Sequence, residues 1–455
     1  MKRRLSEIAA IVGGRLEGED REVSGVVVDS RSASPGDLFF GLPGERADGR
    51  SFVAEAFRAG AGGAVSASPD PSVPVVVVAE PGRALLDLAS AHRAGLGATV
   101  VGITGSVGKT SVKDLTATVL GSRMNVVASP GSYNTEIGLP LTLLAADEAT
   151  EVVVCEMGSR GKGHVALLCE VARPEVGVVT SVGPAHLEMF GSLQAVADAK
   201  AELVESLGTG GTAVLNGDDP VVRGFAGRTR ARTMLFGFGD AVDVRGVGLA
   251  LDAEGHPSFE LAWSGTTHAV ELPIPGEHMA SNALAACAVG LALGASVEEC
   301  ATALKAAAVS PSRMETFTDR RGVVVVDDAY NANPMSMAAA LRSARWIAHE
   351  GACIAVLGEM AELGEASSIE HERVGELVAR LGIDHLIVVG DAAAPIAAGA
   401  LREGVEPERV RRVRDNQEAF AVVRDLAEPG DVVLIKASRR AELERLAHQL
   451  KEGGS

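Results

Sequence analysis

The chain has little basic charge to balance its acidic residues. Its 42 Lys and Arg side chains face 60 Asp and Glu side chains, so the formal net charge at pH 7 is −18. Proteins that bind the nucleic-acid backbone rely on a basic surface, so this balance argues against that class. An anionic ligand would need local basic groups that act against the field of the whole protein.

Paired cysteines and long apolar runs are also missing. The five cysteines show no C-x-x-C spacing, which argues against a disulfide framework and a cysteine zinc site and fits a reducing compartment. After the basic start Met1–Arg4, the apolar run 8–12 is too short for a signal peptide. No stretch of the sequence approaches the roughly 20 apolar residues of a membrane span. We therefore expect a cytoplasmic protein without a membrane partner.

Length and composition predict a globular protein of several domains. Hydrophobic residues make up 47% and charged residues 22% of the 455 residues, and this length exceeds one ordinary core. The pattern of apolar runs changes near residue 97 and again near residue 312. We therefore expect domains at 1–96, 97–311 and 312–455.

The first block contains short β-rich runs at 25–28, 37–40 and 73–78, with helices expected at 52–59 and 84–94. The later blocks alternate buried strands with longer helices, which predicts mostly parallel sheets. Between them, residues 231–272 form short alternating runs that predict an antiparallel flap, followed by a helix at 278–293. The strands expected in the two later blocks are 99–104, 152–156, 176–182, 212–216, 323–327, 353–357, 385–389 and 432–436.

A glycine-rich turn follows the first strand of the central block and opens a helix. Its glycines would let backbone N–H groups approach phosphates, and the helix N-terminus adds partial positive charge. Lys109 would reach the terminal phosphates and Thr110 would hold Mg²⁺. Because residue 103 is Ile, the strict G-x-x-x-x-G-K-[ST] spacing is not met, and a tight turn with an incidental Lys is the alternative. The predicted nucleotide-binding residues are Thr104, Gly105, Ser106, Val107, Gly108, Lys109, Thr110 and Ser111.

Two further polar residues are expected at the same edge of the central sheet. Glu156 ends one predicted strand, and His186 lies in the loop after the next. Ligands of open α/β sheets bind at the carboxyl ends of the strands. Either residue alone would more often be solvated or packed, but together with the phosphate loop they indicate a metal and phosphate-transfer site.

Lys200 falls in the apolar stripe of a predicted helix at 192–207, so we expect it to face inward. An inward ammonium beside Mg²⁺ would be costly through desolvation and like-charge repulsion. A lysine whose head group reaches back to water is the alternative. The expected stripe consists of Leu193, Val196, Ala197, Leu203, Val204 and Leu207.

Taken together, these motifs resemble those of the Mur ligases. The similar segments are the phosphate loop, Glu156, G-P-A-H-L-E at 183–188 and A-K-A-E at 199–202, and the resemblance covers essentially the whole chain. It implies an ATP-dependent, ADP-forming ligase with two Mg²⁺ ions and a carbamylated Lys200 that bridges them. The implied catalytic residues are Lys109, Lys200 and His186, and the implied metal ligands are Thr110, Glu156, His186 and Lys200.

The resemblance also assigns nucleotide contacts outside the phosphate loop. The segment 276–284 resembles one that contacts adenine, and its His278 and Asn282 lie four residues apart on one helical face. In the segment 312–315, which joins two domains, Arg313 would reach phosphate. Asn331 would contact the nucleotide from the third block, where Lys436 and Arg439 are further basic candidates.

The third block resembles the family members that add D-alanyl-D-alanine to a UDP-linked muramoyl tripeptide through an acyl phosphate. The similar segments are D-D-A-Y-N-A-N-P-M-S-M at 327–337 and G-E-M-A-E-L-G at 358–364, with His371 further on. Helix capping explains Asn333 and Pro334, but not the polar cluster before them. The family usually has Gly where this chain has Ala437.

Two more segments resemble substrate-binding parts of the family. D-S-R at 29–31, followed by G-D-L-F-F at 36–40, resembles the UDP-binding start, and S-Y-N-T at 132–135 resembles the segment that faces the muramoyl substrate. The substrate contacts implied by the resemblance are Ser30, Arg31, Asn134, Thr135, Asp328, Tyr330 and Asn331.

The implied fold class is α/β with three domains. They are a small α/β domain for the UDP substrate, a central P-loop ATPase domain with a parallel sheet and an antiparallel flap, and a Rossmann-like C-terminal domain that binds D-alanyl-D-alanine. Small molecules are the expected partners, and a monomer is the expected state. The alternatives are another Mur-type or folylpolyglutamate-type ligase, a P-loop motor ATPase and a non-catalytic nucleotide-binding regulator; the D-N-P-R signature of the diaminopimelate-adding relative is absent.

Overall fold

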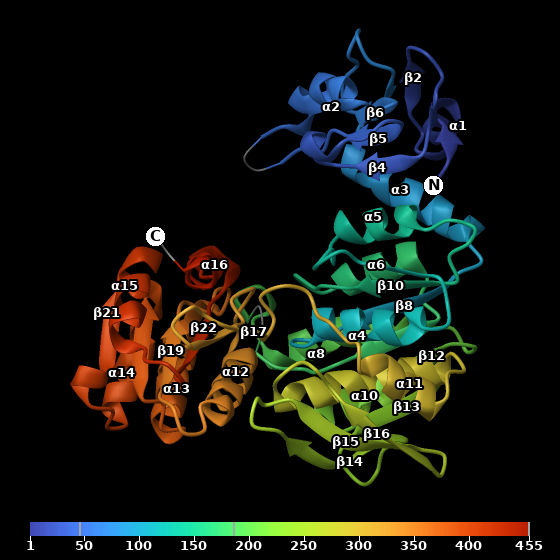
Figure 1. Ribbon diagram of the computed structural model, residues 1–455. Coiled ribbons are helices and arrows are strands. Elements are labelled where there is room, and N and C mark those ends of the chain that lie inside the picture. The colour runs from blue at the N-terminus through green and yellow to red at the C-terminus, as the bar shows by residue number, and fades with distance from the viewer. Residues whose placement is uncertain (45–46, 185–186, 454–455) are drawn as a thin grey trace.

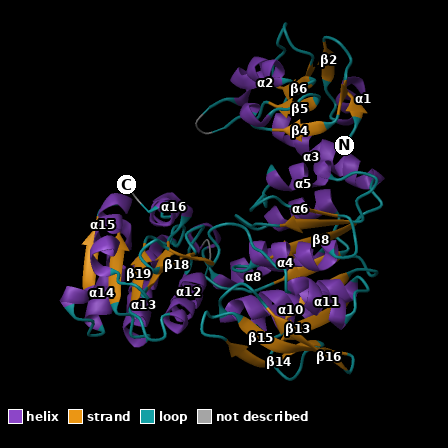
Figure 2. Cartoon of the chain, in the orientation of Figure 1, coloured by secondary structure: helices purple, strands orange, loops and turns teal. Residues whose placement is uncertain are grey.

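The computed structural model describes residues 1–44, 47–184 and 187–453, which form three α/β domains in chain order (Figure 1). The N-terminal domain lies at the top of the figure, the central domain below it, and the C-terminal domain to the left. Helices cover the sheets of all three domains (Figure 2). Within the described ranges, no helix is both long and apolar enough to cross a membrane. Our exact domain limits stay a prediction.

The N-terminal domain contains a five-stranded sheet of order β2-β7-β6-β5-β4. Strands β4 to β7 pair in parallel, while β2 runs antiparallel to β7. Helix α3 packs both on this sheet and on α5 of the central domain, so the two domains share one apolar cluster. The elements are β1 (Arg3–Arg4), α1 (Leu5–Ile11), β2 (Arg15–Glu17), β3 (Glu22–Val23), β4 (Gly25–Val27), β5 (Asp37–Phe40), α2 (Val53–Ala59), β6 (Gly63–Ser66), β7 (Val75–Val77) and α3 (Pro81–Gly95).

The central domain contains a nine-stranded sheet of order β16-β15-β14-β13-β12-β11-β8-β10-β9. Its strands are β8 (Thr99–Thr104), β9 (Val126–Ala128), β10 (Val152–Glu156), β11 (Val176–Val179), β12 (Thr212–Asn216), β13 (Arg232–Gly237), β14 (Val244–Leu251), β15 (Pro257–Trp263) and β16 (Thr266–Glu271). Its helices are α4 (Lys109–Gly121), α5 (Gly138–Ala145), α6 (His164–Ala172), α7 (Leu187–Phe190), α8 (Leu193–Glu205), α9 (Pro220–Gly224), α10 (Glu277–Ala292) and α11 (Val297–Leu304).

The strands that carry the site are buried on both faces. Val101 and Ile103 of β8 pack with α4 and α10, whereas Val100 belongs to the cluster on the other face with α5 and α6. A parallel strand covered on both sides reads as a continuous apolar run, which is why the ends of β8 and β10 could be predicted to the residue. Both strands therefore place their carboxyl ends at one edge of the sheet.

One expectation for the central domain was wrong in part. We expected an antiparallel flap over 231–272, but β13 pairs in parallel with β12, and β14 begins in parallel with β13. Only β14, β15 and β16 pair antiparallel. The alternating pattern marks strands with one face exposed, and such a pattern does not reveal the direction of the neighbouring strand.

The C-terminal domain contains a six-stranded sheet of order β17-β18-β22-β19-β20-β21. All neighbours are parallel except β17, which was not predicted and runs antiparallel to β18. The strands are β17 (Glu315–Thr318), β18 (Val324–Asp327), β19 (Cys353–Leu357), β20 (His385–Val389), β21 (Val410–Val413) and β22 (Val432–Lys436). The helices are α12 (Pro334–Ile347), α13 (Ser367–Arg380), α14 (Ala394–Arg402), α15 (Asn416–Leu426) and α16 (Glu444–Glu452).

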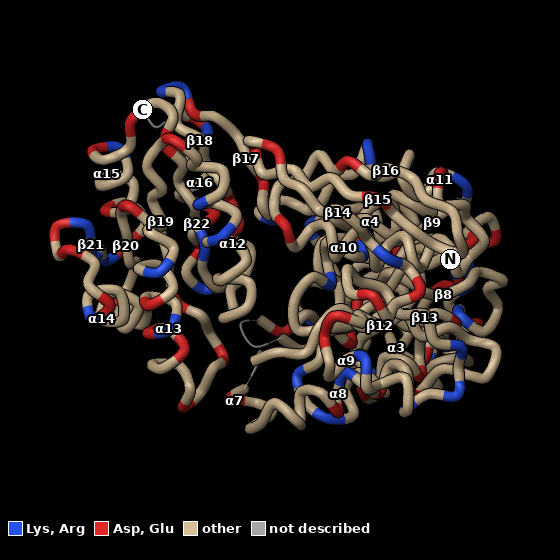
Figure 3. Tube along the Cα trace, turned by 90° about the horizontal axis from the view of Figure 1, so that it is seen from below, with Lys and Arg blue, Asp and Glu red and all other residues tan. Residues whose placement is uncertain are grey.

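The cysteines are all buried in the core, whereas charged residues occur along the whole trace. All five cysteines are free and buried, and burial raises the pKa of Cys155, Cys169 and Cys353 to about 12. Acidic and basic residues are interspersed along the trace in Figure 3. Local basic groups are therefore available despite the acidic net charge.

Candidate active site

A cavity of about 370 Å³ lies between the central and C-terminal domains. Its central side consists of the phosphate loop, the segments after β9 and β10, and residues of α8 and α10. Its C-terminal side consists of Arg313 and of the segments that follow β18, β19 and β22. The predicted site residues that line it are Ser106, Val107, Gly108, Lys109, Thr110, Ser111, Asn134, Thr135, Glu156, Lys200, His278, Asn282, Arg313, Asp328, Tyr330 and Asn331.

The phosphate loop is held by hydrogen bonds to the segment that follows β11. Ser106 N donates to Ser181 O at 2.9 Å, and Thr180 Oγ1 donates to Val107 O at 2.5 Å. Gly108 has φ +84°, and a Cβ there would lie 2.6 Å from Asn282 Oδ1. These hydrogen bonds fix the backbone of the loop. Thr104 and Gly105 are not among the residues that line the cavity.

Lys109 is the first residue of α4, and its Nζ donates to Gly105 O at 2.7 Å. Burial lowers the pKa of Lys109, Glu156 raises it, and the nearby Arg313 lowers it further. A ligand with several negative charges would favour the ammonium form of this side chain. Lys109 lines the cavity at the start of α4, and its binding to phosphate stays a prediction.

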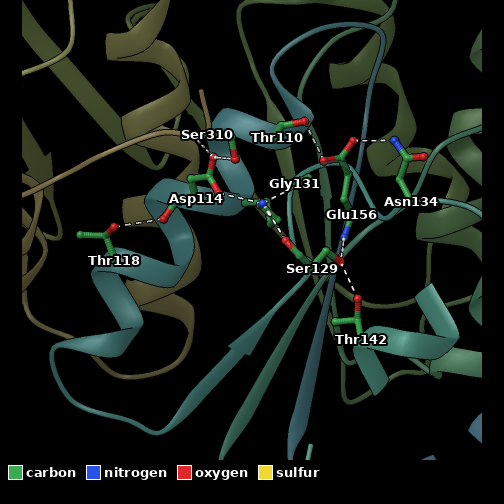
Figure 4. Close-up of polar contacts among 10 residues, drawn as sticks. Thr110, Asp114, Thr118, Ser129, Gly131, Asn134, Thr142, Glu156 and Ser310 are labelled. Carbon is green, nitrogen blue, oxygen red and sulfur yellow. Dashed lines mark hydrogen bonds and ion pairs between the residues drawn. The ribbon is translucent and has the colours of Figure 1, made fainter. Parts of the chain in front are cut away.

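Glu156 ends β10 and is only 1% exposed. Figure 4 shows the side chains of Thr110 and Asn134 pointing toward its carboxylate. Its Oε2 accepts from Thr110 Oγ1 and its Oε1 from Asn134 Nδ2, both at 2.7 Å. Carboxylate and hydroxyl oxygens are the ligands that Mg²⁺ prefers, and a carboxylate buried against two neutral donors fits a cation. The third expected ligand, His186, lies outside the described residues.

Lys200 of α8 is 2% exposed, as predicted from its place in the apolar stripe, and its Nζ donates to Ser159 Oγ at 3.3 Å. Burial lowers its pKa well below the usual value, and the neighbouring Lys109 adds to this effect. The neutral amine is thereby favoured. One member of the predicted stripe was wrong: Leu193 is 46% exposed, because it is the first residue of the helix, directly after the N-cap Ser192.

Helix α10 contributes His278 and Asn282 to the cavity. His278 Nδ1 is buried and has no hydrogen-bond partner among the described residues. Burial lowers the pKa of His278, Asp328 raises it and Lys436 lowers it. Because a buried polar atom without a partner is costly, this nitrogen indicates a place for a polar ligand group.

The C-terminal side of the cavity is built from an ion pair and stacked side chains. Lys436 is 2% exposed, and its Nζ contacts Asp328 Oδ2 at 2.5 Å and Asn331 O at 3.0 Å. The guanidinium groups of Arg313 and Arg439 lie 4.2 and 5.4 Å from the centre of the Tyr330 ring. Cation–π contacts hold both arginines beside the cavity.

Several lining residues were not predicted. Asn333, which we explained by helix capping alone, accepts from Ser336 N at 2.9 Å and also donates from Nδ2 to Ser106 O of the phosphate loop at 3.4 Å. The segment after Glu156 adds Ser159, Arg160 and His164. Its position directly after a strand-end glutamate was the available sequence signal.

Two predicted substrate residues lie elsewhere. Ser30 and Arg31 are in the N-terminal domain, which contributes none of the described residues that line the cavity. Ser30 Oγ donates to Glu55 Oε1 at 3.0 Å, and Arg31 pairs with Asp29 at 2.6 Å. His371 is also outside: its Nε2 accepts from Met360 N at 2.8 Å and so fixes the loop after β19.

Comparisons with known proteins agree with this arrangement. Models of the "Mur ligase family, catalytic domain", the "Mur ligase middle domain" and the "Mur ligase, glutamate ligase domain" match residues 22–92, 103–290 and 312–439. The UDP-N-acetylmuramoyl-tripeptide–D-alanyl-D-alanine ligase of Mycobacterium tuberculosis is 42% identical, with 98% of this chain and 97% of that protein covered. The ligase of the same name from Bacillus subtilis is 35% identical, with 99% of each covered.

Solved structures are similar over the whole chain. A crystal structure of MurF from Acinetobacter baumannii has a TM-score of 0.89 at 28% identity and covers 99% of both chains. MurF from Thermotoga maritima in complex with ADP has a TM-score of 0.82 at 29% identity, covering 94% of this chain and 97% of that one. The three-domain arrangement is therefore that of these structures.

Proposed function

The chain belongs to the Mur ligase family, and we propose that it joins D-alanyl-D-alanine to UDP-N-acetylmuramoyl-tripeptide in peptidoglycan precursor synthesis, with conversion of ATP to ADP. The observation that carries this proposal is one cavity lined both by the phosphate loop and by the segment around Tyr330. Full-length relatives named for this activity support it. A folylpolyglutamate synthase structure is similar at only 20% identity and supports the fold alone.

The reaction needs charge neutralisation more than acid–base chemistry. The tripeptide carboxylate attacks the γ-phosphate of ATP to give an acyl phosphate and ADP, and the amine of the dipeptide then displaces phosphate. Every partner in the first step is anionic, so positioning and electrostatic stabilisation dominate. Lys109 and Arg313 line opposite sides of the cavity and would neutralise the phosphates, together with Arg439, which lies beside Tyr330. Closure of the two sides excludes water from the acyl phosphate.

Mg²⁺ supplies further charge neutralisation when bound, and Thr110 and Glu156 are the described residues that would hold it. His186 stays a proposed ligand from its motif. Lys200 is proposed to carry a carbamate, because a buried amine kept neutral is the form that reacts with CO₂. The carbamate would replace an unwanted cation by oxygen ligands suited to Mg²⁺.

The remaining assignments concern the contacts with adenine and UDP, the cellular location and the oligomeric state. His278 and Asn282 are proposed to contact adenine, with Arg313 and Asn331 on the opposite side. Ser30 and Arg31 are proposed to contact the UDP group from the N-terminal domain. A cytoplasmic location and a monomeric state complete the proposal, and the five free, buried cysteines support a reducing location.

The test is a phosphate-release assay with single omissions. Release should require ATP, Mg²⁺, the UDP-muramoyl tripeptide and D-alanyl-D-alanine together. If free D-Ala, L-Lys or glutamate served as well as the dipeptide, the assignment within the family would be wrong.

A further inference from the structure

Two adjacent residues of α4, neither of which lines the cavity, contact two segments that carry lining residues. Figure 4 shows Asp114 of this pair beside Ser310, with Ser129 and Gly131 nearby. Lys113 is 2% exposed, and its Nζ donates to Ser129 O at 2.7 Å and to Gly131 O at 2.8 Å. The third contact of the ammonium is Asp114 Oδ1 at 2.7 Å. The buried charge thus has a full set of partners, two of them in one irregular loop.

That loop carries residues of the central side of the cavity. It connects β9 to α5 and contains Ser132 and Asn134, which line the cavity. Asn134 donates to Glu156 Oε1, and Ser129 Oγ accepts from Glu156 N at 3.2 Å. The loop therefore holds Glu156 by both its side chain and its backbone.

Asp114 extends the connection to the C-terminal domain. Its Oδ2 accepts from both the N and the Oγ of Ser310 at 2.8 Å. Ser310 belongs to the connection between α11 and β17, three residues before Arg313. Arg313 lines the cavity and stacks on Tyr330, whose hydroxyl contacts Ser132 Oγ.

Helix α4 relates these contacts to the nucleotide. Lys109 and Thr110 are in its first turn, and Lys113 follows them at spacings of four and three residues, which places the three on neighbouring positions of one rigid helix. A displacement of the loop at 129–134 relative to the phosphate loop is therefore resisted by the two bonds from Lys113, in addition to the contacts of the loop with Glu156. The bonds from Lys113 to the loop belong neither to a helix cap nor to the pairing of strands.

We propose that Lys113 and Asp114 are positioning residues. They hold the loop 129–135 and the connection 310–313 in fixed positions relative to the phosphate loop. Lys113 thereby sets the affinity for the UDP-muramoyl tripeptide, and its removal leaves two loop carbonyls without their donor. This inference rests on the proposed function for the identity of the substrate. The placement of the loop itself can be measured without any substrate.

The experiment compares Lys113→Met with two matched controls. In Lys113→Met, the KM for the UDP-muramoyl tripeptide should rise at least about 10-fold, while ADP affinity measured by calorimetry changes less than about twofold. Lys305→Met removes an exposed lysine of the same domain and should change neither. Val119→Ala creates a cavity in the buried face of α4 and should lower Tm without changing KM.

Hydrogen exchange followed by mass spectrometry gives a readout that does not depend on substrate identity. Peptides that cover 129–135 should exchange faster in Lys113→Met than in wild type or Val119→Ala. Unchanged exchange, or an unchanged tripeptide KM in a folded, active Lys113→Met protein, overturns the inference. Absence of dipeptide-dependent phosphate release in wild type contradicts the proposed function instead, and the exchange comparison still decides the role of Lys113.

If Lys113→Met does not fold, Asp114→Asn replaces it. This variant keeps the lysine but removes its counter-charge, and it leaves one oxygen where Asp114 has Oδ1 for Lys113 and Oδ2 for both donors of Ser310. We expect a smaller rise of tripeptide KM, on the order of threefold, with faster exchange at 307–313. Normal exchange and normal KM in this variant contradict the proposal.

Discussion

The two sides of the cavity are held in place by different kinds of interaction. On the central side, backbone hydrogen bonds join the phosphate loop to the segment after β11, and Gly108 allows a backbone conformation that other residues rarely adopt. On the C-terminal side, the ion pair of Lys436 with Asp328 and the stacking of Arg313 on Tyr330 place the groups. The backbone thus positions the phosphate loop on the central side, whereas contacts of charged side chains position the groups on the C-terminal side.

The largest effect is expected where the central side supports the chemistry itself. Lys200→Ala should fold but lose turnover by a factor on the order of 10²–10³, as when one transition-state group is removed. Formate or acetate should restore part of the rate by filling the vacated ligand position. Lys200→Arg should not recover, since it keeps the positive charge. Turnover is measured by phosphate release, and a near-normal rate for Lys200→Arg would contradict the proposed carbamate.

A smaller effect tests the preorganised backbone. Gly108→Ala combines a strained φ with a Cβ 2.6 Å from Asn282 Oδ1, and such strain costs about 1–3 kcal/mol. The ATP KM should rise by about 10- to 100-fold. The matched control is Gly294→Ala, which has a similar φ of +87° but no neighbour within 4 Å of the added Cβ. If Gly294→Ala raised the ATP KM equally, the effect of Gly108→Ala would be due to lost stability alone.

The C-terminal side should respond to pH through Asp327, next to the ion pair. Burial raises its pKa to about 6, while hydrogen bonds from Ser312 Oγ and Ala329 N act against this rise. Its folded pKa lies above the ordinary 3.8, so its contribution to stability is fully present below pH 4 and is lost as pH rises through 6. Allowing for partial solvation, the loss is about 1–2 kcal/mol.

Asp327→Asn removes this titration and should be more stable than wild type at pH 8, with a flatter pH dependence between 4 and 7. Urea denaturation of both proteins over this range measures the difference. An equal pH dependence in wild type and variant would show that the buried carboxyl has no such role.

The smallest effect concerns contact between the two sides. Asn333→Ser keeps an N-cap for α12 but loses the bond from Nδ2 to Ser106 O. We expect the ATP KM to rise about fivefold, equivalent to about 1 kcal/mol, with little change in Tm. Asp415→Ser, which changes the N-cap of α15 away from the cavity, is the control and should leave KM unaltered. A lower Tm with unchanged KM in Asn333→Ser would leave only the capping role.

The sequence predicted the central side more completely than the C-terminal side. The phosphate loop and Glu156 follow uninterrupted apolar strands, whose ends were predicted to the residue. Lys200 could be placed because one charge within an apolar stripe must be accommodated inward. The second role of Asn333 could not be predicted, since its N-cap pattern already accounts for the residue.

Other features depend on neighbours distant in sequence. Lys113 is followed by Asp114 in a helix, which reads as an ordinary surface pair, and only the loop at 129–131 explains its burial. Ala437, where the family usually has Gly, is fully buried beside Gly358, and a Cβ on Gly358 would lie 2.7 Å from that of Ala437. The departure is accommodated because the residue opposite is glycine.

Because all five thiols are buried, their reaction with a thiol reagent would report when parts of the folded protein open. Four are in the central domain, one is in the C-terminal domain, and the first 96 residues contain none. A thiol reagent should therefore label a cysteine only when the core around it opens, and mass spectrometry can assign each label to its cysteine. Unfolding confined to the N-terminal domain would leave Cys287, Cys300 and Cys353 unlabelled, whereas Cys155 and Cys169 lie in the apolar cluster that this domain shares with the central domain.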